Sequence, residues 1–290
     1  MENCLNISGM KIGNNQPTWI CAEIGINHNA SLDIAKKLID VAKSSGCDAI
    51  KFQKRTTELQ YTDEELAQPR ISPFGATNGD LKRALEFGYD DYCEIDKYCK
   101  KIGIIWLASA WDKPSVDFLE QFDVPAHKIP SAKNNDYEFI KYVRKTNKPI
   151  IMSCGMSTSP EICDATSFLN LDNIALLVCT ATYPASIESL NLNRIHTLQN
   201  SYPGIPIGYS HHNPGLWMAL CAVAMGSCLL EFHVTLDRSL FGSDQSSSIE
   251  PQGIKKLIQE IRCFEQAKGN GVLEIHPSEI PVMEKLHRLK

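Results

Sequence analysis

The chain has 290 residues, 43% of them hydrophobic and 22% charged, and a formal net charge of -5. These values are ordinary for a soluble globular protein, and no basic stripe is present that would bind nucleic acid. No apolar run is long enough to span a membrane, and the stretch from Met1 to Pro17 has no signal-peptide core, so we expect a cytoplasmic protein without a membrane partner. The 11 cysteines form no C-x-x-C pair, which is typical of buried thiols in a reducing compartment.

Alternating strand and helix patterns follow a short polar start. The predicted strands are Trp19–Gly25, Asp48–Gln53, Ile104–Ala108, His127–Pro130, Pro149–Ser153, Ile174–Cys179, Ile205–Ser210 and Ser227–Thr235. The predicted helices begin near Ser31, Asp90, Pro114, Asp136, Pro160, Leu190, Pro214 and Pro251. Residues 55–90 are a long, mostly polar excursion, which in a compact domain is usually functional or contains short helices.

This alternation predicts a parallel sheet with helical crossovers. Eight such units in a chain of this length favour a TIM (β/α)8 barrel over an open doubly wound sheet, and no G-x-G-x-x-G follows the first strand. We therefore predict a single α/β barrel domain over residues 1–290, with its core at about 17–268. In such a barrel the active site lies at the carboxyl ends of the strands.

Two of the predicted strands end in histidine. The period of two places Glu231 and His233 on one side of the last strand, and Ser210 and His212 on one side of the strand before it. Two imidazoles on adjacent strands would give nitrogen ligands to one divalent metal ion. The alternative is that both histidines only form hydrogen bonds at the strand ends.

Two lysines, Lys51 and Lys128, lie inside predicted strands, where an unpaired ammonium group is costly to bury. Together with several serines they indicate a site for a phosphate or carboxylate next to the metal. Ion pairs with neighbouring carboxylates, a Schiff-base aldolase and a non-catalytic barrel are the alternatives. The polar residues at the strand ends are Glu23, Lys51, Gln53, Ser109, Lys128, Ser131, Ser153, Thr180, Ser210, His212, Glu231 and His233.

Several of these residues lie in motifs that resemble the sialic acid synthase family. The motifs run in the order of the family and extend from Trp19 to about Leu273. They are Ala22–Asn29, Ile50–Gln53, His127–Ser131, Ser153–Met156, Cys179–Pro184, Gly208–His212 and Glu231–Thr235.

The resemblance implies a C–C bond-forming transferase of carbohydrate and polysaccharide biosynthesis. Enzymes of this family condense phosphoenolpyruvate with an N-acylmannosamine-like aldose to a 2-keto-3-deoxy sugar acid and release phosphate. The residues that would hold phosphoenolpyruvate are Lys51, Ser109, Lys128, Ser131, Ser153 and Ser210. By the same resemblance Gln53, Tyr183 and Asp244 would contact the sugar, and His212 and His233 would bind a divalent metal, Mn2+ first, with Mg2+ or Co2+ as alternatives. Glu23 would orient the sugar or a water, or form a structural salt bridge.

Two departures from the family pattern bear on function. Lys133 stands where the family has a glutamate beside the sugar, which suggests an acidic or differently substituted aldose and places Lys133 among the substrate-binding candidates. The family also carries a C-terminal antifreeze-like domain, exchanged between the subunits of a homodimer, and this sequence ends at Lys290 without one. We therefore expect an open mouth, or one closed by residues 55–90, by the loop 240–249 or by a separate cap-domain protein. A non-catalytic or partner-dependent barrel subunit that needs a cap domain in trans is the alternative function.

Overall fold

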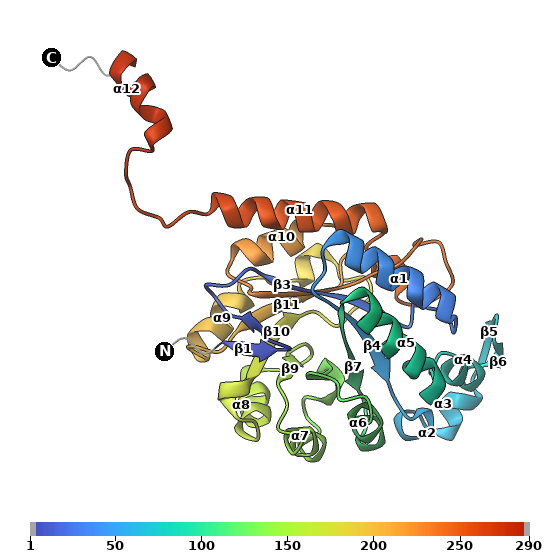
Figure 1. The fold of residues 1–290 in the computed structure, drawn as a ribbon. Coiled ribbons are helices and arrows are strands. Elements are labelled where there is room, and N and C mark those ends of the chain that lie inside the picture. The colour runs from blue at the N-terminus through green and yellow to red at the C-terminus, as the bar shows by residue number, and fades with distance from the viewer. Residues whose placement is uncertain (1–3, 287–290) are drawn as a thin grey trace.

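Eight parallel strands close into a barrel in this protein, whose computed structural model describes residues 4–286 (Figure 1). Around the barrel the strands follow the order β10-β11-β12-β3-β4-β7-β8-β9. They are β3 (Trp19–Gly25), β4 (Ala49–Lys54), β7 (Ile105–Ala110), β8 (His127–Ile129), β9 (Ile150–Ser153), β10 (Ile174–Cys179), β11 (Ile207–His211) and β12 (Leu229–His233). The predicted TIM barrel is confirmed.

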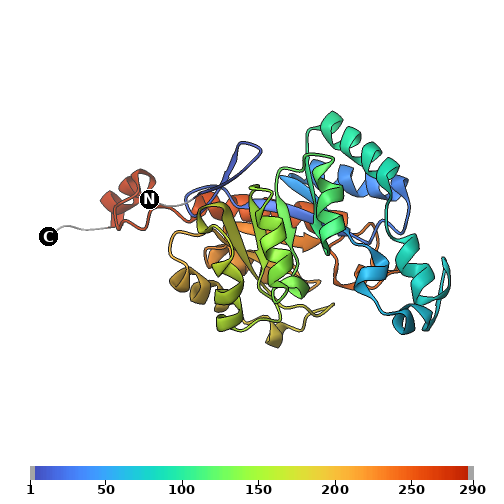
Figure 2. The ribbon, with the colours of Figure 1, turned by 90° about the horizontal axis from the view of Figure 1, so that it is seen from below.

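A helix follows each strand and covers the outside of the barrel (Figures 1 and 2). Ser31 caps the first of these helices by accepting a hydrogen bond from the Ile34 amide, and Gly46 ends it with a left-handed φ of 94°. The helix predicted from Leu190 begins instead at Arg194, because Asn191 has a left-handed backbone (φ 44°) that a right-handed helix excludes. The helices are α1 (Leu32–Ser45), α5 (Tyr89–Ile102), α6 (Lys113–Glu120), α7 (Tyr137–Arg144), α8 (Ser159–Ser167), α9 (Arg194–Ser201), α10 (Trp217–Ala224) and α11 (Pro251–Ala267).

The interior of the barrel has two halves. Toward the amino ends of the strands the inward-facing side chains are apolar, and an N-terminal hairpin of β1 (Leu5–Ile7) and β2 (Met10–Ile12) packs against them. We call this the apolar half; its buried members include Leu5, Ile7, Ile12, Trp19, Ala49, Leu107, Ile151, Leu177 and Leu229. The hairpin lies outside the predicted core of about 17–268 and was not expected from its short, polar sequence.

The excursion between β4 and α5 contains short elements, as its length predicted. They are α2 (Thr57–Gln60), α3 (Asp63–Ala67), β5 (Pro69–Ser72), β6 (Gly75–Thr77) and α4 (Asn78–Ala84). Capping boxes at Thr62 and Thr77 start two of the helices. The excursion therefore adds a small, ordered lobe to one side of the barrel (Figures 1 and 2).

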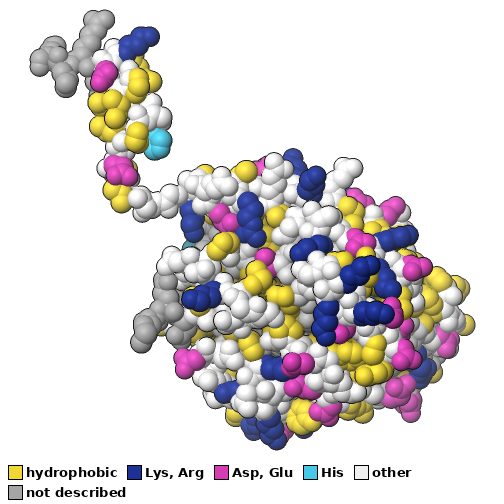
Figure 3. All heavy atoms as spheres, in the orientation of Figure 1, with side chains coloured by type: hydrophobic (Ala, Val, Ile, Leu, Met, Phe, Trp, Pro, Cys, Tyr) yellow, Lys and Arg dark blue, Asp and Glu magenta, His cyan; other side chains and the backbone are white. Residues whose placement is uncertain are grey.

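The segment after α11 leaves the barrel and ends in the short helix α12 (Ile280–Leu286), which was not predicted. It projects on the side opposite the excursion and carries hydrophobic side chains on its surface (Figures 1 and 3). Leu273 and Val282 are both exposed. Over residues 4–286, every helix is too short or too polar to cross a bilayer.

Candidate active site

The carboxyl ends of the strands enclose a cavity of about 150 Å³ lined mainly by polar side chains. Five of these side chains lie two residues beyond a buried apolar residue of the same strand, because alternate residues of a strand point to the same side. They are Glu23, Lys51, Ser109, Ser153 and Glu231, which follow Cys21, Ala49, Leu107, Ile151 and Leu229. We call this end the polar half of the barrel interior. The predicted site residues that line the cavity are Glu23, Lys51, Gln53, Ser109, Lys128, Ser131, Ser153, Tyr183, Ser210, His212 and His233.

Lys51 lies at the centre of the charged group. Its Nζ is 2.6 Å from Glu23 Oε2, 3.8 Å from Glu231 Oε1 and donates a hydrogen bond of 2.9 Å to Ser109 Oγ. The barrel register sets these contacts, since Lys51 pairs with Glu23 on the neighbouring strand. Burial alone would lower the pKa of Lys51, but the two carboxylates outweigh burial and raise this pKa. Lys51 is therefore a fixed, protonated cation.

Lys128 lies across Glu231 from Lys51. Its Nζ is 2.5 Å from Ser153 Oγ and 3.7 Å from Glu231 Oε1. Burial lowers the pKa of Lys128, although Glu231 opposes that effect. Burial by itself would raise the pKa of Glu231, but Lys128 and Lys51 prevail and lower it to about 2. Glu231 is thus a buried carboxylate that bridges the two lysines through one oxygen.

Glu231 was placed on the interior side of its strand by the sequence pattern but was given no function. Its Oε1 also accepts a hydrogen bond of 3.1 Å from Ser210 Oγ. The two lysines and the carboxylates of Glu23 and Glu231 together carry no net charge. An anion that enters this group therefore needs either a proton or an added cation to balance it.

Gln53 connects this charged group to the outer part of the cavity. Its Nε2 donates 2.9 Å to Glu23 Oε1, and its Oε1 accepts a hydrogen bond from Arg55 Nη2. The guanidinium of Arg55 is also paired with Glu86 at 2.7 Å and lies 4.8 Å from the ring centre of Trp111, which lines the cavity. Neither Arg55 nor Trp111 was predicted. Arg55 could have been found, because it follows Gln53 by two residues.

A close approach between two loops forms the wall beside Lys128. Ser131 Oγ accepts a hydrogen bond of 3.0 Å from the Gly155 amide and lies 3.1 Å from Cys179 Sγ. A Cβ at position 155 would lie 2.7 Å from Ser131 Oγ and 2.6 Å from Cys179 Sγ. Only glycine fits here, so the backbone amide reaches the serine directly.

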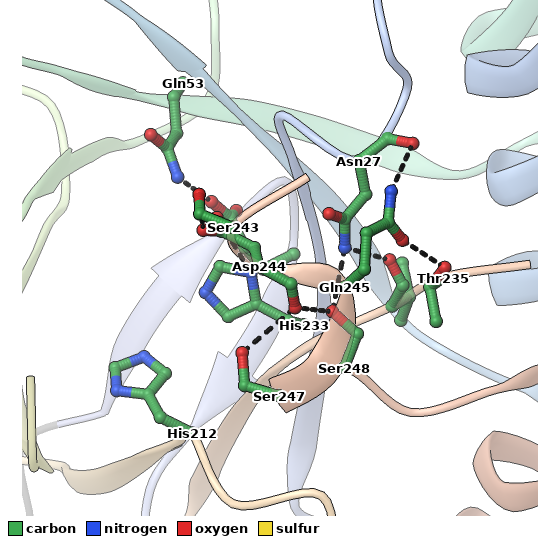
Figure 4. Close-up of polar contacts among 12 residues, drawn as sticks. Asn27, Gln53, His212, His233, Thr235, Ser243, Asp244, Gln245, Ser247 and Ser248 are labelled. Carbon is green, nitrogen blue, oxygen red and sulfur yellow. Dashed lines mark hydrogen bonds and ion pairs between the residues drawn. The ribbon is translucent and has the colours of Figure 1, made fainter. Parts of the chain in front are cut away.

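The two predicted metal ligands lie side by side, with ring centroids 5.4 Å apart (Figure 4). The Nδ1 of His212 is 2.7 Å from the Thr180 carbonyl oxygen, so Nδ1 carries the proton and donates it. The other nitrogen, Nε2, keeps its lone pair and is 3.3 Å from Ser210 Oγ. Burial and the neighbouring His233 lower the pKa of His212 to about 3. His212 is therefore a neutral imidazole, the form that binds metal ions.

Asp244 lies next to His233, with its Oδ2 3.6 Å from His233 Nδ1, and does not line the cavity (Figure 4). Its loop is anchored by Ser247 and Ser248, whose hydroxyls donate 3.0 Å and 2.6 Å to the Asp244 carbonyl oxygen. Asn27, which lies just after β3, links the same loop to that strand by donating a hydrogen bond of 2.8 Å to Ser248 Oγ. The structure thus brings Asp244 to the histidine pair but not to the cavity surface.

Lys133 does not line the cavity. It ends a 3-10 turn (Ser131–Lys133), and its Nζ lies 3.6 Å from Asp136 Oδ2 and 6.0 Å from the ring centre of Phe139. Ala132, the preceding residue, lines the cavity instead. The positive charge of Lys133 is therefore paired outside the site, which does not favour the expectation that Lys133 selects an acidic sugar.

Comparison with known proteins identifies a family model that matches this chain and several similar proteins. The model of the NeuB family matches residues 38–273. The N-acetylneuraminate-9-phosphate synthase of Homo sapiens is 38% identical over 283 residues, covering 96% of this chain and 79% of that protein. The N,N'-diacetyllegionaminic acid synthase of Campylobacter jejuni is 36% identical over 270 residues, covering 90% and 80%. The crystal structure of an N-acetylneuraminic acid (sialic acid) synthetase from Leptospira borgpetersenii in complex with citrate superposes with a TM-score of 0.86 at 30% identity, covering 100% of this chain and 99% of that one.

Proposed function

Because this chain belongs to the NeuB family, we propose that it condenses phosphoenolpyruvate with an aldose and releases phosphate, forming a sialic-acid-like 2-keto-3-deoxy sugar acid. The predicted resemblance to the sialic acid synthases is confirmed, and with it the prediction of a C–C bond-forming transferase. One observation carries the reaction assigned to the site. Two buried lysines, held by serines and carboxylates, share one cavity with His233 and with the neutral imidazole of His212.

The lysines would hold the carboxylate and phosphate of phosphoenolpyruvate. Lys51 and Lys128 are 3% exposed and are already oriented by Ser109 and Ser153, so little reorganisation is needed when the anion binds. Fixed charges at buried positions stabilise a developing anion more strongly than they would in solvent. Glu231 keeps the two ammonium groups in place before the substrate arrives, and its low pKa makes it a poor proton acceptor.

A divalent cation fits the chemistry of the donor atoms. The charged group sums to zero, and the Nε2 of His212 is a lone-pair donor whose direction the Thr180 carbonyl fixes. In the described part of the chain no set of three or more His, Cys, Asp or Glu side chains is arranged to hold a metal. We therefore propose an open site in which His212 and His233 hold Mn2+, or Mg2+ or Co2+, with the remaining positions left to water or substrate. When bound, the ion supplies Lewis-acid polarisation of the aldehyde.

The bonds that change are these. C3 of phosphoenolpyruvate attacks the aldehyde carbon, a C–C bond forms and C2 becomes electron-poor. Water adds to C2, and the tetrahedral intermediate collapses as the bond between C2 and the bridging oxygen breaks, so phosphate leaves with that oxygen. Lys51 and Lys128 stabilise the departing phosphate. Glu23 is 1% exposed and bonded to Gln53 and Lys51. These contacts support a task in orienting the sugar or the water, or a structural salt bridge with Lys51.

A Schiff-base aldolase is less well supported by the geometry. Such an enzyme needs a neutral amine, and the contacts of Lys51 with Glu23 and Glu231 raise its pKa. Lys128 has a lowered pKa and would be the candidate nucleophile. Borohydride trapping of a covalent adduct on Lys128 in the presence of a keto acid would establish that alternative, and its absence would leave the condensation.

Phosphoenolpyruvate labelled with 18O in the bridging position tests the proposed bond cleavage. The wild-type chain with Mn2+ and N-acetylmannosamine should give a keto sugar acid with the mass of the aldose plus that of pyruvic acid. All of the label should appear in inorganic phosphate. His212→Ala should give neither product, and the matched control His196→Ala, which changes an exposed helix histidine, should behave as wild type. Label retained in the organic product would instead indicate P–O cleavage and reject the proposed bond cleavage, whereas absence of the sugar acid would reject the condensation. The relatives include both a 9-phosphate synthase and a diacetyllegionaminic acid synthase, so the choice of sugar needs its own argument.

A further inference from the structure

We propose that the outer part of the cavity accepts an aldose that carries no phosphate or other charge at the end remote from its aldehyde. This inference rests on the proposed condensation. Its basis is the distribution of charge in the cavity, which is confined to the deep end. Lys51 and Lys128 are the cations among the lining residues, and both contact Glu231. The proposed function assigns both to the anionic groups of phosphoenolpyruvate.

The rim of the cavity is neutral. It is lined by Trp111, Ala132, Met156, Ala181 and Tyr183. Met156 is 66% exposed and Tyr183 is 44% exposed, so these side chains form the surface that a second substrate meets first. Aromatic and thioether groups pack well against the C–H faces of a sugar. None of them carries a positive charge that would pair with a phosphate dianion.

The basic residues adjacent to the lining are already paired. Arg55 is bonded to Gln53, forms an ion pair of 2.7 Å with Glu86 and stacks on Trp111, and it is only 8% exposed. Lys133, which follows the lining residue Ala132, is paired with Asp136. Within residues 4–286 the rim therefore has no lining cation for a sugar phosphate.

Arg55 has a different task under this proposal. Its donation to Gln53 Oε1 turns the Nε2 of that amide toward Glu23, and its stacking supports Trp111 from behind. Arg55 is thus a positioning residue for Gln53 and Trp111, two side chains that line the cavity. Its guanidinium is paired with the carboxylate of Glu86, so it does not serve as an anion receptor.

The direct test compares N-acetylmannosamine with N-acetylmannosamine 6-phosphate, each with phosphoenolpyruvate and Mn2+, by phosphate release and product mass. We expect kcat/KM for the neutral sugar to exceed that for its phosphate by about ten-fold or more, since the site leaves the second dianion unpaired. Equal use of the two sugars, or preference for the phosphorylated one, overturns this inference while leaving the condensation intact. No turnover with any aldose, from a folded protein, would reject the condensation and this inference with it.

A variant at the rim sharpens the result. Met156→Lys places an ammonium group at an exposed lining position, and Met156→Gln is the uncharged control of similar size. The lysine variant should reduce the preference for the neutral sugar several-fold, and the glutamine variant should not. Arg55→Lys should raise KM for the aldose and leave KM for phosphoenolpyruvate unchanged. A lysine ammonium cannot reproduce the several hydrogen bonds of the planar guanidinium or its stacking on Trp111. Equal increases in both KM values would show that Arg55 only supports the fold.

Discussion

The apolar and polar halves of the barrel interior are built from the same strands, yet their inward-facing residues differ in kind. On β4 Ala49 is followed two residues later by Lys51, and on β7 Leu107 is followed by Ser109. The first residue of each pair packs into the apolar cluster that the N-terminal hairpin closes. The second faces the cavity. One pleat of the strand, about 7 Å, separates a stabilising position from a functional one.

The two halves differ in what they contribute to the stability of the fold. In the apolar half, the removal of side chains such as Leu107 and Trp19 from water stabilises the folded protein. The polar half buries two lysines and two carboxylates, which rarely stabilises a protein by itself. Changes in the apolar half should therefore reduce stability alone. Changes in the polar half should reduce activity, and they should also reduce stability where a buried charge loses its partner.

The largest effect is expected from Lys51→Met, which leaves Glu23 without its cation. Activity should fall at least about 1,000-fold, since the anion loses a fixed charge, and the free energy of unfolding should fall by about 3–5 kcal/mol. The double variant Lys51→Met/Glu23→Gln should recover most of the stability but none of the activity. Denaturant titration and phosphate-release kinetics measure the two effects, and a double variant that regained activity would contradict the proposed function of Lys51.

A matched pair on β7 separates the halves most cleanly. Leu107→Ala should lower the free energy of unfolding by about 2–5 kcal/mol through the cavity it creates, while kcat/KM per folded molecule stays near wild type. Ser109→Ala, two residues along the same strand, should lower kcat/KM several-fold and change stability by only about 1 kcal/mol. If the two variants behaved alike, the division into halves would be wrong.

The pH dependence of stability should carry the signature of Glu231. Its pKa in the folded protein is about 2, below the ordinary value of 4.5, so its ionised form stabilises the fold above pH 4.5. This contribution is lost as the pH falls from 4.5 toward 2. Between pH 6 and pH 3 the wild type should therefore lose about 2 kcal/mol more stability than Glu231→Gln. Equal losses in urea titrations of the two proteins would show that the carboxylate is not held ionised by the lysines.

Metal binding should raise the melting temperature by a few degrees through the histidine pair, because a ligand that binds only the folded state stabilises it. Mn2+ at 100 times its Kd would add about 2.7 kcal/mol. His212→Ala should abolish the shift, and the surface control His196→Ala should retain it. Differential scanning calorimetry with and without EDTA reports the result. A full shift in His212→Ala would place the ion elsewhere.

The smallest effect is expected from Lys133→Glu. The side chain lies outside the cavity and is paired with Asp136, so its reversal should leave sugar preference unchanged. A control reversal on the same surface, Lys141→Glu, should be equally silent. Competition between neutral and acidic aldoses measures this directly, and a changed preference in Lys133→Glu alone would restore the expectation drawn from the sequence.

The barrel and most of the cavity lining could be predicted because both follow from periodicity. Alternation within a strand placed Lys51 beside Gln53 and Glu231 beside His233. It could not assign a function to Glu231, whose partners lie on other strands and meet it only when the barrel closes. The same limit hid Trp111, which contacts Arg55 from the loop after a different strand, whereas Arg55 follows Gln53 by two residues and could have been found.

Two features of the structure lie beyond the reach of periodicity. Lys133 follows the end of its strand and lies in a 3-10 turn, so its side chain no longer follows the alternation that placed Lys128 in the cavity. The N-terminal hairpin has strands of only three residues each, too short for a recognisable pattern, and its burial depends on the barrel floor. Long-range contact determines both.

Release of phosphate from phosphoenolpyruvate is the measurement that tests the central claim most directly. It should be followed in four reactions, with aldose and Mn2+ together, with each alone and with neither. The account predicts release only when both are present, with one molecule of sugar acid formed for each phosphate. Release without the aldose would identify a phosphatase, and a folded protein that released none in any reaction would contradict the proposed condensation.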